Sequence, residues 1–232
     1  MARKIGDHLI GKLGQTVTFV VNGVEVTRIQ NPNPHDPLTL GQRIQRSRMK
    51  FASRFLRTLK EPISIGYQET EFDNPYNEAK SYICKNCFRV ERSFIIVLYK
   101  NILISRGNLA KPEECNLSIN DGTYTITWKY NKGSGKTNDK LNVVMFSDVR
   151  QGIEWHHYLA AKRSDEVFTG NIPKSDLPIH FWIFFHNGEI NSKSSKNKVS
   201  DSVYLGSSPA GMSEQEIDVL TYVKKSKKKK KK

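Results

Sequence analysis

The sequence predicts an α+β N-terminal region, made of a hairpin and two helices, followed by an all-β sandwich. Three observations predict this arrangement: an Asn-Gly turn between β-branched runs, a helix-spaced apolar stripe, and short alternating apolar runs from residue 94 onward. We therefore expect an N-terminal region over 1–93, a β-sandwich domain over 94–206, and a linker, a short helix and a disordered lysine tail over 207–232.

The hairpin is predicted around Asn22-Gly23, which separates the runs 17–21 and 24–27. Asn and Gly tolerate the positive φ of a tight type I′ turn, and β-branched residues favour the flanking strands. Three prolines within 32–37 then exclude a helix, so this segment is expected to be an extended linker.

Two helices are expected next. The first is predicted over 39–61, with Thr39 as N-cap and Pro62 as its end. Its apolar stripe consists of Ile44, Phe51, Ala52, Phe55, Leu56 and Leu59. The second helix is predicted from Pro75, a favourable first-turn residue, to about Cys87.

Seven short strands are expected after residue 93: 94–99, 116–119, 124–130, 141–146, 155–161, 179–185 and 200–205. The run from His180 to Phe185 is apolar on both faces, which is typical of a central strand. At the C-terminus, Ser213 and Glu216 predict the start of one short helix that ends near Val223.

The layout of these strands resembles that of an immunoglobulin or fibronectin type III module. An early strand carries Trp128, a late aromatic strand carries Phe181, Ile183 and Phe185, and a closing strand carries Val203-Tyr204-Leu205. The resemblance implies an antiparallel sandwich of about seven strands.

Charge is concentrated in two places. The 232 residues carry 37 basic and 23 acidic side chains, a net charge of +14. Residues 39–61 hold seven basic residues against one acid, Glu61, and the nine-residue tail from Lys224 to Lys232 holds eight lysines, so these segments account for the whole excess. Such a distribution favours a polyanionic partner.

We therefore expect phosphate-backbone contacts with DNA or RNA, without sequence specificity, from the helix and the tail. The candidate residues are Arg43, Arg46, Arg48, Lys50, Arg54, Arg57, Lys60, Lys224, Lys225, Lys227 and Lys228. The alternatives are a contact with protein, a solvated helix face, and a tail that serves only solubility.

Two motifs suggest chemistry that their context does not favour. The string from Gly133 to Thr137 imitates a phosphate-binding loop, but Tyr130 replaces the first glycine and a strand is expected to follow. Cys84 and Cys87 have metal-like spacing, yet a closed zinc site needs four ligands, so buried or idle thiols are the favoured interpretation.

The functional expectation is a non-catalytic, nucleic-acid-associated protein with no cofactor, no metal and no catalytic residues. The alternative is a structural or assembly protein of phage or mobile-element type that uses the β-sandwich for protein contacts or self-association. No apolar run approaches the roughly 18 residues of a membrane span, and no signal-peptide core is present, so a cytoplasmic location is expected, with a virion-associated one as the alternative.

Several landmarks in fixed order also resemble a family of uncharacterised Bacteroidota proteins, a domain of unknown function of about this length. These landmarks are Ile10–Gly14, Gln42–Phe51, Ile65–Tyr67, Asn77–Ala79, Ser81-Tyr82, Ser105–Gly107 and Ser202–Gly206. The resemblance covers nearly all of 1–206 and implies the architecture above, while it leaves the function open because the family has no established activity. The lysine tail and the Cys84/Cys87 pair lie outside it.

Overall fold

The computed structural model describes nine stretches of the chain. They are residues 3–6, 8–30, 38–68, 74–130, 135–147, 153–172, 178–188, 198–209 and 212–219. The chain forms two compact units, and the boundary between them lies between residues 39 and 40. Within the described residues, no helix combines the length and the apolar character needed to cross a membrane.

The first unit contains one antiparallel sheet, in the order β1-β2-β3-β4. Its strands are β1 (Arg3–Ile5), β2 (His8–Leu13), β3 (Thr16–Val21) and β4 (Val24–Ile29). The predicted hairpin is confirmed: Val21 pairs with Val24, and Asn22 and Gly23 have φ values of 50° and 80°. Strands β1 and β2, which precede the hairpin, were not predicted by the residue pattern.

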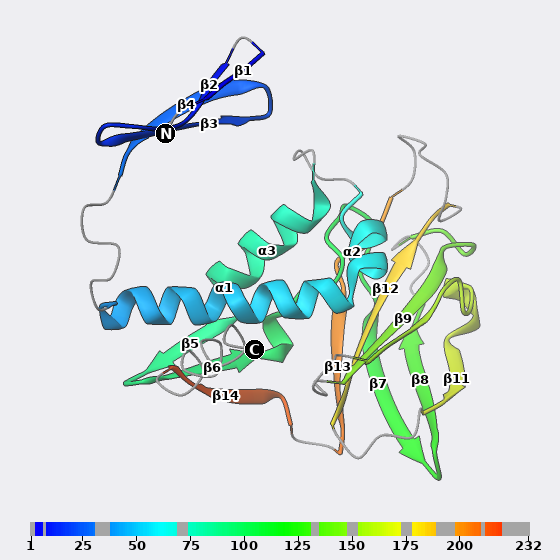
Figure 1. The fold of residues 1–232 in the computed structure, drawn as a ribbon. Helices are drawn as coiled ribbons and strands as arrows, with labels where there is room; N and C mark the ends of the chain where they lie inside the picture. The colour runs from blue at the N-terminus through cyan, green and yellow to red at the C-terminus, as the bar shows by residue number, and fades with distance from the viewer. Residues whose placement is uncertain are drawn as a thin grey trace. The chain divides into compact units, whose positions relative to one another are not determined.

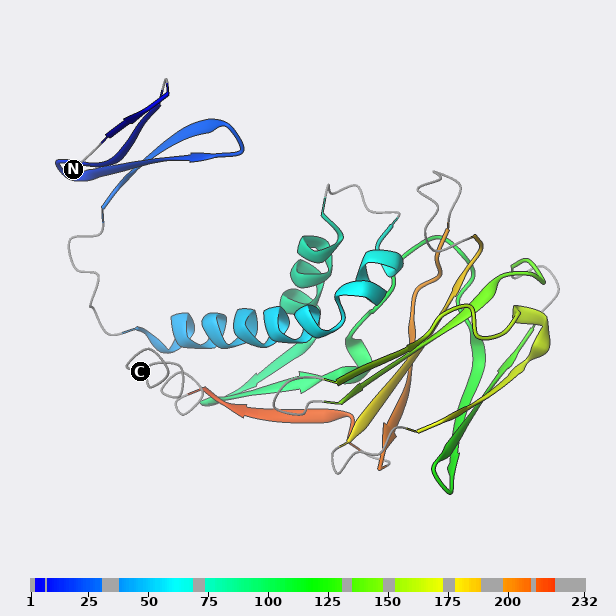
Figure 2. The same cartoon turned by 45° about the vertical axis from the view of Figure 1, so that its right-hand side comes forward.

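The second unit begins with three helices and a small sheet. The helices are α1 (Leu40–Thr58), α2 (Lys60–Gly66) and α3 (Pro75–Asn86). Strands β5 (Phe88–Glu91) and β6 (Phe94–Leu98) form a hairpin, and β14 (Glu214–Asp218) pairs with the other edge of β6. In both views, α1 and α3 lie along one side of this small sheet (Figures 1 and 2).

The other strands form two larger sheets. One has the order β10-β9-β12-β13, from β9 (Lys140–Ser147), β10 (Ile153–His157), β12 (Ile179–His186) and β13 (Val203–Ser208). The other has the order β11-β8-β7, from β7 (Glu113–Asn120), β8 (Thr123–Lys129) and β11 (Val167–Asn171). Two 3-10 turns, η1 (Tyr99–Asn101) and η2 (Arg163–Asp165), complete the elements.

Strand β12 separates two apolar cores, and all eight of its residues are buried. Its odd-numbered residues Phe181, Ile183 and Phe185 share a core with β8 and β9. Its even-numbered residues Trp182 and Phe184 face the helices, where the Phe55 ring lies 6.2 Å from Trp182. The predicted central strand is therefore confirmed, and a strand buried on both faces explains its unbroken apolar run.

The predicted end of the first helix at Pro62 is wrong. Helix α1 ends at Thr58, and α2 resumes at Lys60 with Pro62 in its first turn. Leu59 bridges the two helices, because its amide donates to the Phe55 carbonyl and its carbonyl accepts from Ile63. The N–H groups of a first helical turn have no intrahelical partner, so proline is tolerated there.

The predicted short helix over 213–223 is also corrected where the structure describes it, while residues 220–223 lie outside the described residues. Residues 214–218 form β14, which runs antiparallel to β6 and places Ile217 opposite Ile95. The Tyr99 hydroxyl donates to the Gln215 side chain at 2.7 Å and so holds the strand in place. The capping pattern is local, whereas pairing with the free edge of β6 depends on contacts more than 100 residues away in sequence.

The structure agrees with the prediction that the string from Gly133 to Thr137 is not a phosphate-binding loop, because Gly135 to Thr137 lead into strand β9 and not into a helix. Residues 133 and 134 lie outside the described residues. Gly135 has φ +141°, and a side chain there would collide with the Arg163 side chain. Packing against Arg163 therefore accounts for a glycine at this position without a bound phosphate. The antiparallel sheets agree with a β-rich C-terminal part, while its immunoglobulin-like identity stays a prediction.

Candidate anion-binding surfaces

Helix α1 is amphipathic and packs on the first core with one side. Its buried residues are Ser47, Phe51, Ala52, Phe55 and Leu56. The Phe51 ring meets the rings of Phe88 and Tyr99, and the Phe55 ring lies 4.7 Å from that of Phe146. This packing fixes the rotation of α1 about its axis, and therefore decides where its charged side chains point.

Five of the seven basic residues predicted on this helix form one row, which we call the basic row. It consists of Arg43, Arg46, Lys50, Arg54 and Arg57. At 3.6 residues per turn these positions fall within an arc of roughly 80° on the side away from the core. Four of the five residues are exposed and Arg43 is half-buried. Burial and the nearby charge of Arg54 lower the pKa of Lys50.

The other two predicted helix residues lie off this row. Arg48 belongs to the side of α1 that faces α3, with its guanidinium carbon 5.9 Å from the centre of the Phe88 ring. Its Nε is buried and has no hydrogen-bond partner within the described residues. Lys60 is exposed at the start of α2. The predicted tail residues Lys224, Lys225, Lys227 and Lys228 lie outside the described residues.

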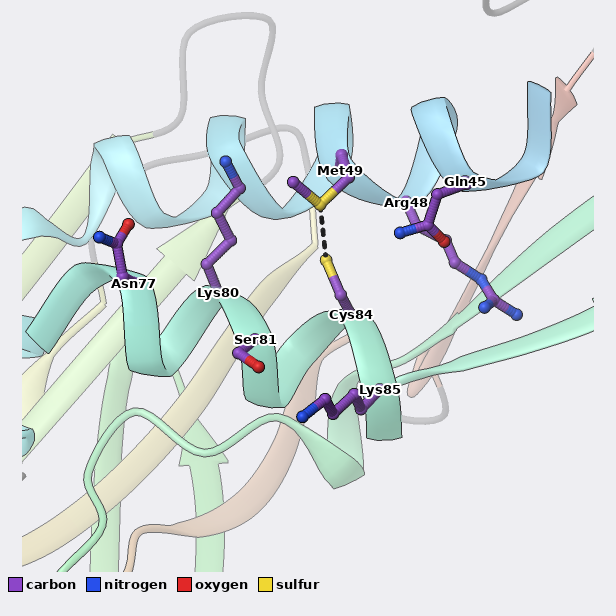
Figure 3. Close-up of a pocket in the computed structure, with 8 residues that line it drawn as sticks. All are labelled: Gln45, Arg48, Met49, Asn77, Lys80, Ser81, Cys84 and Lys85. Carbon is purple, nitrogen blue, oxygen red and sulfur yellow. Dashed lines mark hydrogen bonds between the residues drawn. The ribbon is translucent and has the colours of Figure 1, made fainter. Parts of the chain in front are cut away.

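A groove between α1 and α3 forms a second cationic surface, and its cavity has a volume of about 530 Å³. It is lined by Gln45, Arg48 and Met49 from α1 and by Asn77, Lys80, Ser81, Cys84 and Lys85 from α3. The helices run in opposite directions here, so Lys80 and Asn77 lie toward one end of the groove and Arg48 and Gln45 toward the other (Figure 3).

A contact between two sulfur atoms lies in the middle of the groove. The Cys84 Sγ is 3.4 Å from the Met49 Sδ, as the dashed line in Figure 3 marks. Burial raises the pKa of the Cys84 thiol, and the charges of Lys80 and Arg48 oppose that rise. Both cations therefore act on the same point between the helices, although they come from different ones.

The two cysteines of the CxxC sequence do not converge. Cys84 faces Met49, whereas the buried Cys87 thiol donates to the Asn101 carbonyl at 3.2 Å. Burial raises the pKa of Cys87 to about 12, which keeps it a neutral thiol. Within the described residues, no group of three or more His, Cys, Asp or Glu side chains is placed to hold a metal ion.

His180 is a histidine of the core, 4% exposed. His180 on β12 stacks on Tyr99 with ring centres 3.8 Å apart, and its Nδ1 lies 2.9 Å from the Tyr204 hydroxyl. Burial lowers the pKa of His180 to about 4, so its imidazole is neutral near pH 7. Aromatic packing surrounds this ring, and the lining of the groove does not include it.

Sequence reasoning found the basic row but missed the groove. Its α3 side repeats polar residues at helical spacing, at Asn77, Lys80, Ser81, Cys84 and Lys85. That pattern marks an outward helix face, and a single helix cannot reveal that Arg48 of another helix lies beside it. The signal becomes visible only once α1 and α3 are known to pack together.

Comparison with known proteins gives a family and no function. The model of a family of unknown function, DUF6266, matches residues 8–206. This match agrees with the expected resemblance to an uncharacterised family, while the bacterial group and the fibronectin type III module stay predictions. Neither a curated protein nor a solved structure matches the chain.

Proposed function

Because the chain belongs to the DUF6266 family, we propose a function from its own surface: a non-catalytic protein that binds the phosphate backbone of nucleic acid. The observation that carries this proposal is the basic row, in which five cations share one side of α1. Solvated helix faces normally mix both signs of charge, and this row contains no acid.

The dimensions of the row suit a phosphate backbone. Arg57 follows Arg43 by fourteen positions, which corresponds to about 21 Å along the helix axis. A DNA strand presents one phosphate per roughly 3.4 Å of axis, so the row spans about six of them. Four of its members are arginines, and the guanidinium fork binds phosphate oxygens in pairs.

Packing of α1 against the core adds pre-organisation. Phe51 and Phe55 fix the helix, so the row does not have to be assembled when a ligand arrives. No base-reading element is implied, and affinity should depend on charge and salt far more than on sequence. The lysine tail is proposed to add further contacts of the same kind.

The test measures affinity for duplex DNA and for RNA across a salt series. Three chains are compared: the full chain, a chain that ends at Val223, and a triple variant with Arg46→Gln, Lys50→Gln and Arg57→Gln. The cut at Val223 removes the tail but keeps β14, which a chain that ends at Gly206 would lose. The loss of three phosphate contacts should reduce the slope of log affinity against log salt concentration by about 2 to 3 in the triple variant.

The matched control removes three exposed lysines that lie off the row and outside the predicted contacts, with Lys100→Gln, Lys111→Gln and Lys136→Gln. The net charge changes equally in both triple variants. A loss of slope in the row variant alone supports the proposal. Equal losses in both variants, or binding that disappears with the tail alone, would reduce the row to a solvated surface.

A second function, assembly through protein contacts, is favoured by the first unit. Strand β4 lies at the edge of its sheet, and all six of its residues are exposed. Val24 is 63% exposed and Ile29 is 76% exposed. Exposed apolar edge strands are sites at which another chain can add a strand.

For this alternative we propose self-association, tested by sizing nuclease-treated protein over a range of concentrations. Val26→Lys places a charge on β4 and should shift an oligomer toward the monomer. Gln15→Lys, at an exposed position in the turn between β2 and β3, is the matched control for added charge. Wild-type protein that stays monomeric at every concentration contradicts self-association.

A further inference from the structure

The groove between α1 and α3 has features that the basic row does not explain. Its lining includes three cations, Arg48, Lys80 and Lys85, and no carboxylate. None of the three forms an ion pair within the part of the chain that the structure describes. Three like charges that line one groove favour an anion within it.

The strongest single observation is Arg48. Its Nε is buried and has no hydrogen-bond partner in the described residues, although a buried donor without a partner is costly. Arginine has five N–H donors in a planar fork, and the ring of Phe88 supports that fork from one side at 5.9 Å. Arg48 therefore brings to the groove lining a guanidinium that donates to no acceptor within the described residues.

Neutral hydrogen-bonding groups complete the lining. Gln45, Asn77 and Ser81 offer amide and hydroxyl groups beside the cations. The cavity of about 530 Å³ falls within the range of small-molecule sites, so it has room for more than a single ion. The Cys84–Met49 contact provides a sulfur surface between the two cationic ends.

We propose that this groove is a binding site for a phosphate monoester, which lies over the Cys84–Met49 contact between Arg48 of α1 at one end and Lys80 of α3 at the other, with Lys85 of α3 as a third cation. A phosphate monoester carries nearly two negative charges at pH 7 and three acceptor oxygens, which matches three cations better than a carboxylate does. The site lies on a different side of α1 from the basic row. It is therefore a separate function that does not depend on backbone binding.

The phosphate group can come from three sources: inorganic phosphate, a small phosphorylated molecule, or the 5′ end of a nucleic acid. All three share the recognition chemistry, and the experiment separates them. The Cys84 thiol provides a local reporter, because it lies in the groove and reacts with neutral iodoacetamide only as the thiolate. A bound dianion would cover the thiol and cancel the charges that favour the thiolate.

The experiment follows alkylation of each cysteine by peptide mass spectrometry on the full chain at neutral pH. Inorganic phosphate is titrated against sodium chloride and sodium acetate of equal ionic strength. We expect phosphate to slow Cys84 alkylation until the site is saturated. The alkylation rate should fall by about tenfold for each unit by which bound phosphate raises the pKa of the thiol. Cys115 on β7 lies outside the groove and should react at an unchanged rate.

Variants assign the effect to the groove. Arg48→Met and Lys80→Met should each abolish the saturable protection, whereas Arg57→Met removes an equal charge from the basic row and should keep it. Lys85→Gln replaces an exposed side chain with little risk to folding and should weaken the saturable protection. Circular dichroism checks that every variant is folded.

The source is identified with a 5′-mononucleotide and with oligonucleotides that carry a 5′-phosphate or a 5′-hydroxyl. Protection by the mononucleotide at lower concentration than inorganic phosphate assigns a small molecule. The row variant (Arg46→Gln, Lys50→Gln and Arg57→Gln) is used for the oligonucleotides. If only the oligonucleotide with a 5′-phosphate protects Cys84 in that variant, the ligand is the 5′ end of a nucleic acid. If phosphate protects no better than chloride, or protects Arg48→Met as well as wild type, the proposal is overturned, whatever the row binds.

Discussion

The Arg163 guanidinium donates to the Asp139 carboxylate at 3.0 Å, and the two side chains are only 3% and 1% exposed. Arg163 also donates to the Ala110 carbonyl and lies 3.8 Å from the centre of the Phe185 ring. Asp139 accepts a second hydrogen bond from the Lys136 amide. The pair therefore fixes the chain before β9 onto the core beneath it.

Removal of one member of this buried pair should be strongly destabilising. Asp139→Ala leaves the Arg163 charge buried without its carboxylate, which costs on the order of 3–5 kcal/mol. Urea unfolding measures this loss. Lys129→Ala breaks an exposed ion pair with Glu114 and should change stability far less than Asp139→Ala does. Equal losses in the two variants would contradict the structural role assigned to Asp139.

Stability should fall as the pH drops from about 6.5 to 4, because His180 is buried as the neutral imidazole. Its folded pKa of about 4 lies below the unfolded value of 6.5, so the unfolded chain binds the proton first. The contribution is complete above pH 6.5 and is lost toward pH 4, with a limit of about 3 kcal/mol. Urea unfolding at several pH values measures it.

The His180 contribution is isolated by comparison of variants. His180→Phe should flatten the pH dependence of stability over this range. Other groups, such as the buried His186, whose pKa is also lowered, contribute equally in wild type and variant, so their contributions cancel when the two curves are subtracted. Tyr204→Phe removes the hydroxyl next to His180 but keeps the titrating ring, so its pH dependence should stay steep. An unchanged slope in His180→Phe would refute the assignment.

Gly66 should not tolerate a side chain. A Cβ at this position would collide with the Ile104 carbonyl oxygen and lie 2.8 Å from the Ser105 Cα, both of them backbone atoms. Gly66→Ala should therefore destabilise the fold by about 1–3 kcal/mol in thermal or urea unfolding.

Gly41 is the matched control for Gly66, because it lies in the first turn of α1 and no atom lies within 4 Å of a Cβ built there. Gly41→Ala should be neutral, or stabilising by about 0.5–1 kcal/mol through helix propensity. Destabilisation by Gly41→Ala as large as that by Gly66→Ala would show that the close approach to 104–105 is not the cause.

Strand β14 should protect β6 from hydrogen exchange. Ile217→Ser removes a buried side chain opposite Ile95 and should speed amide exchange along β6. Glu216→Ser changes the exposed neighbour in the same strand and should leave that exchange nearly unchanged. Exchange that responds equally to both substitutions would argue against a packed β14.

The sequence predicts elements well where the signal is local. Asn22-Gly23 determines its turn by backbone conformation alone, and the apolar stripe of α1 follows from helical spacing. The alternation at Tyr124, Ile126 and Trp128 likewise identifies β8 and its buried face. In each case a few neighbouring residues carry all the information.

Elements that depend on distant partners were not predictable in this way. Residues 214–218 have a helix-capping pattern, and only the edge of β6 makes them a strand. The row on α1 could be found because its residues lie on one helix. The groove needs Arg48 of α1 beside Lys80 of α3, a relationship set by tertiary packing.

The burial of β12 on both faces has a consequence for how the protein can be divided. The helical layer and the β11-β8-β7 layer each use one side of the same strand, so neither core is complete without it. A chain cut near residue 93 would leave α1 without Trp182 and Phe184, its apolar counterparts. Residues 40–219 should therefore melt in a single transition, and separately expressed halves should be insoluble until they are combined.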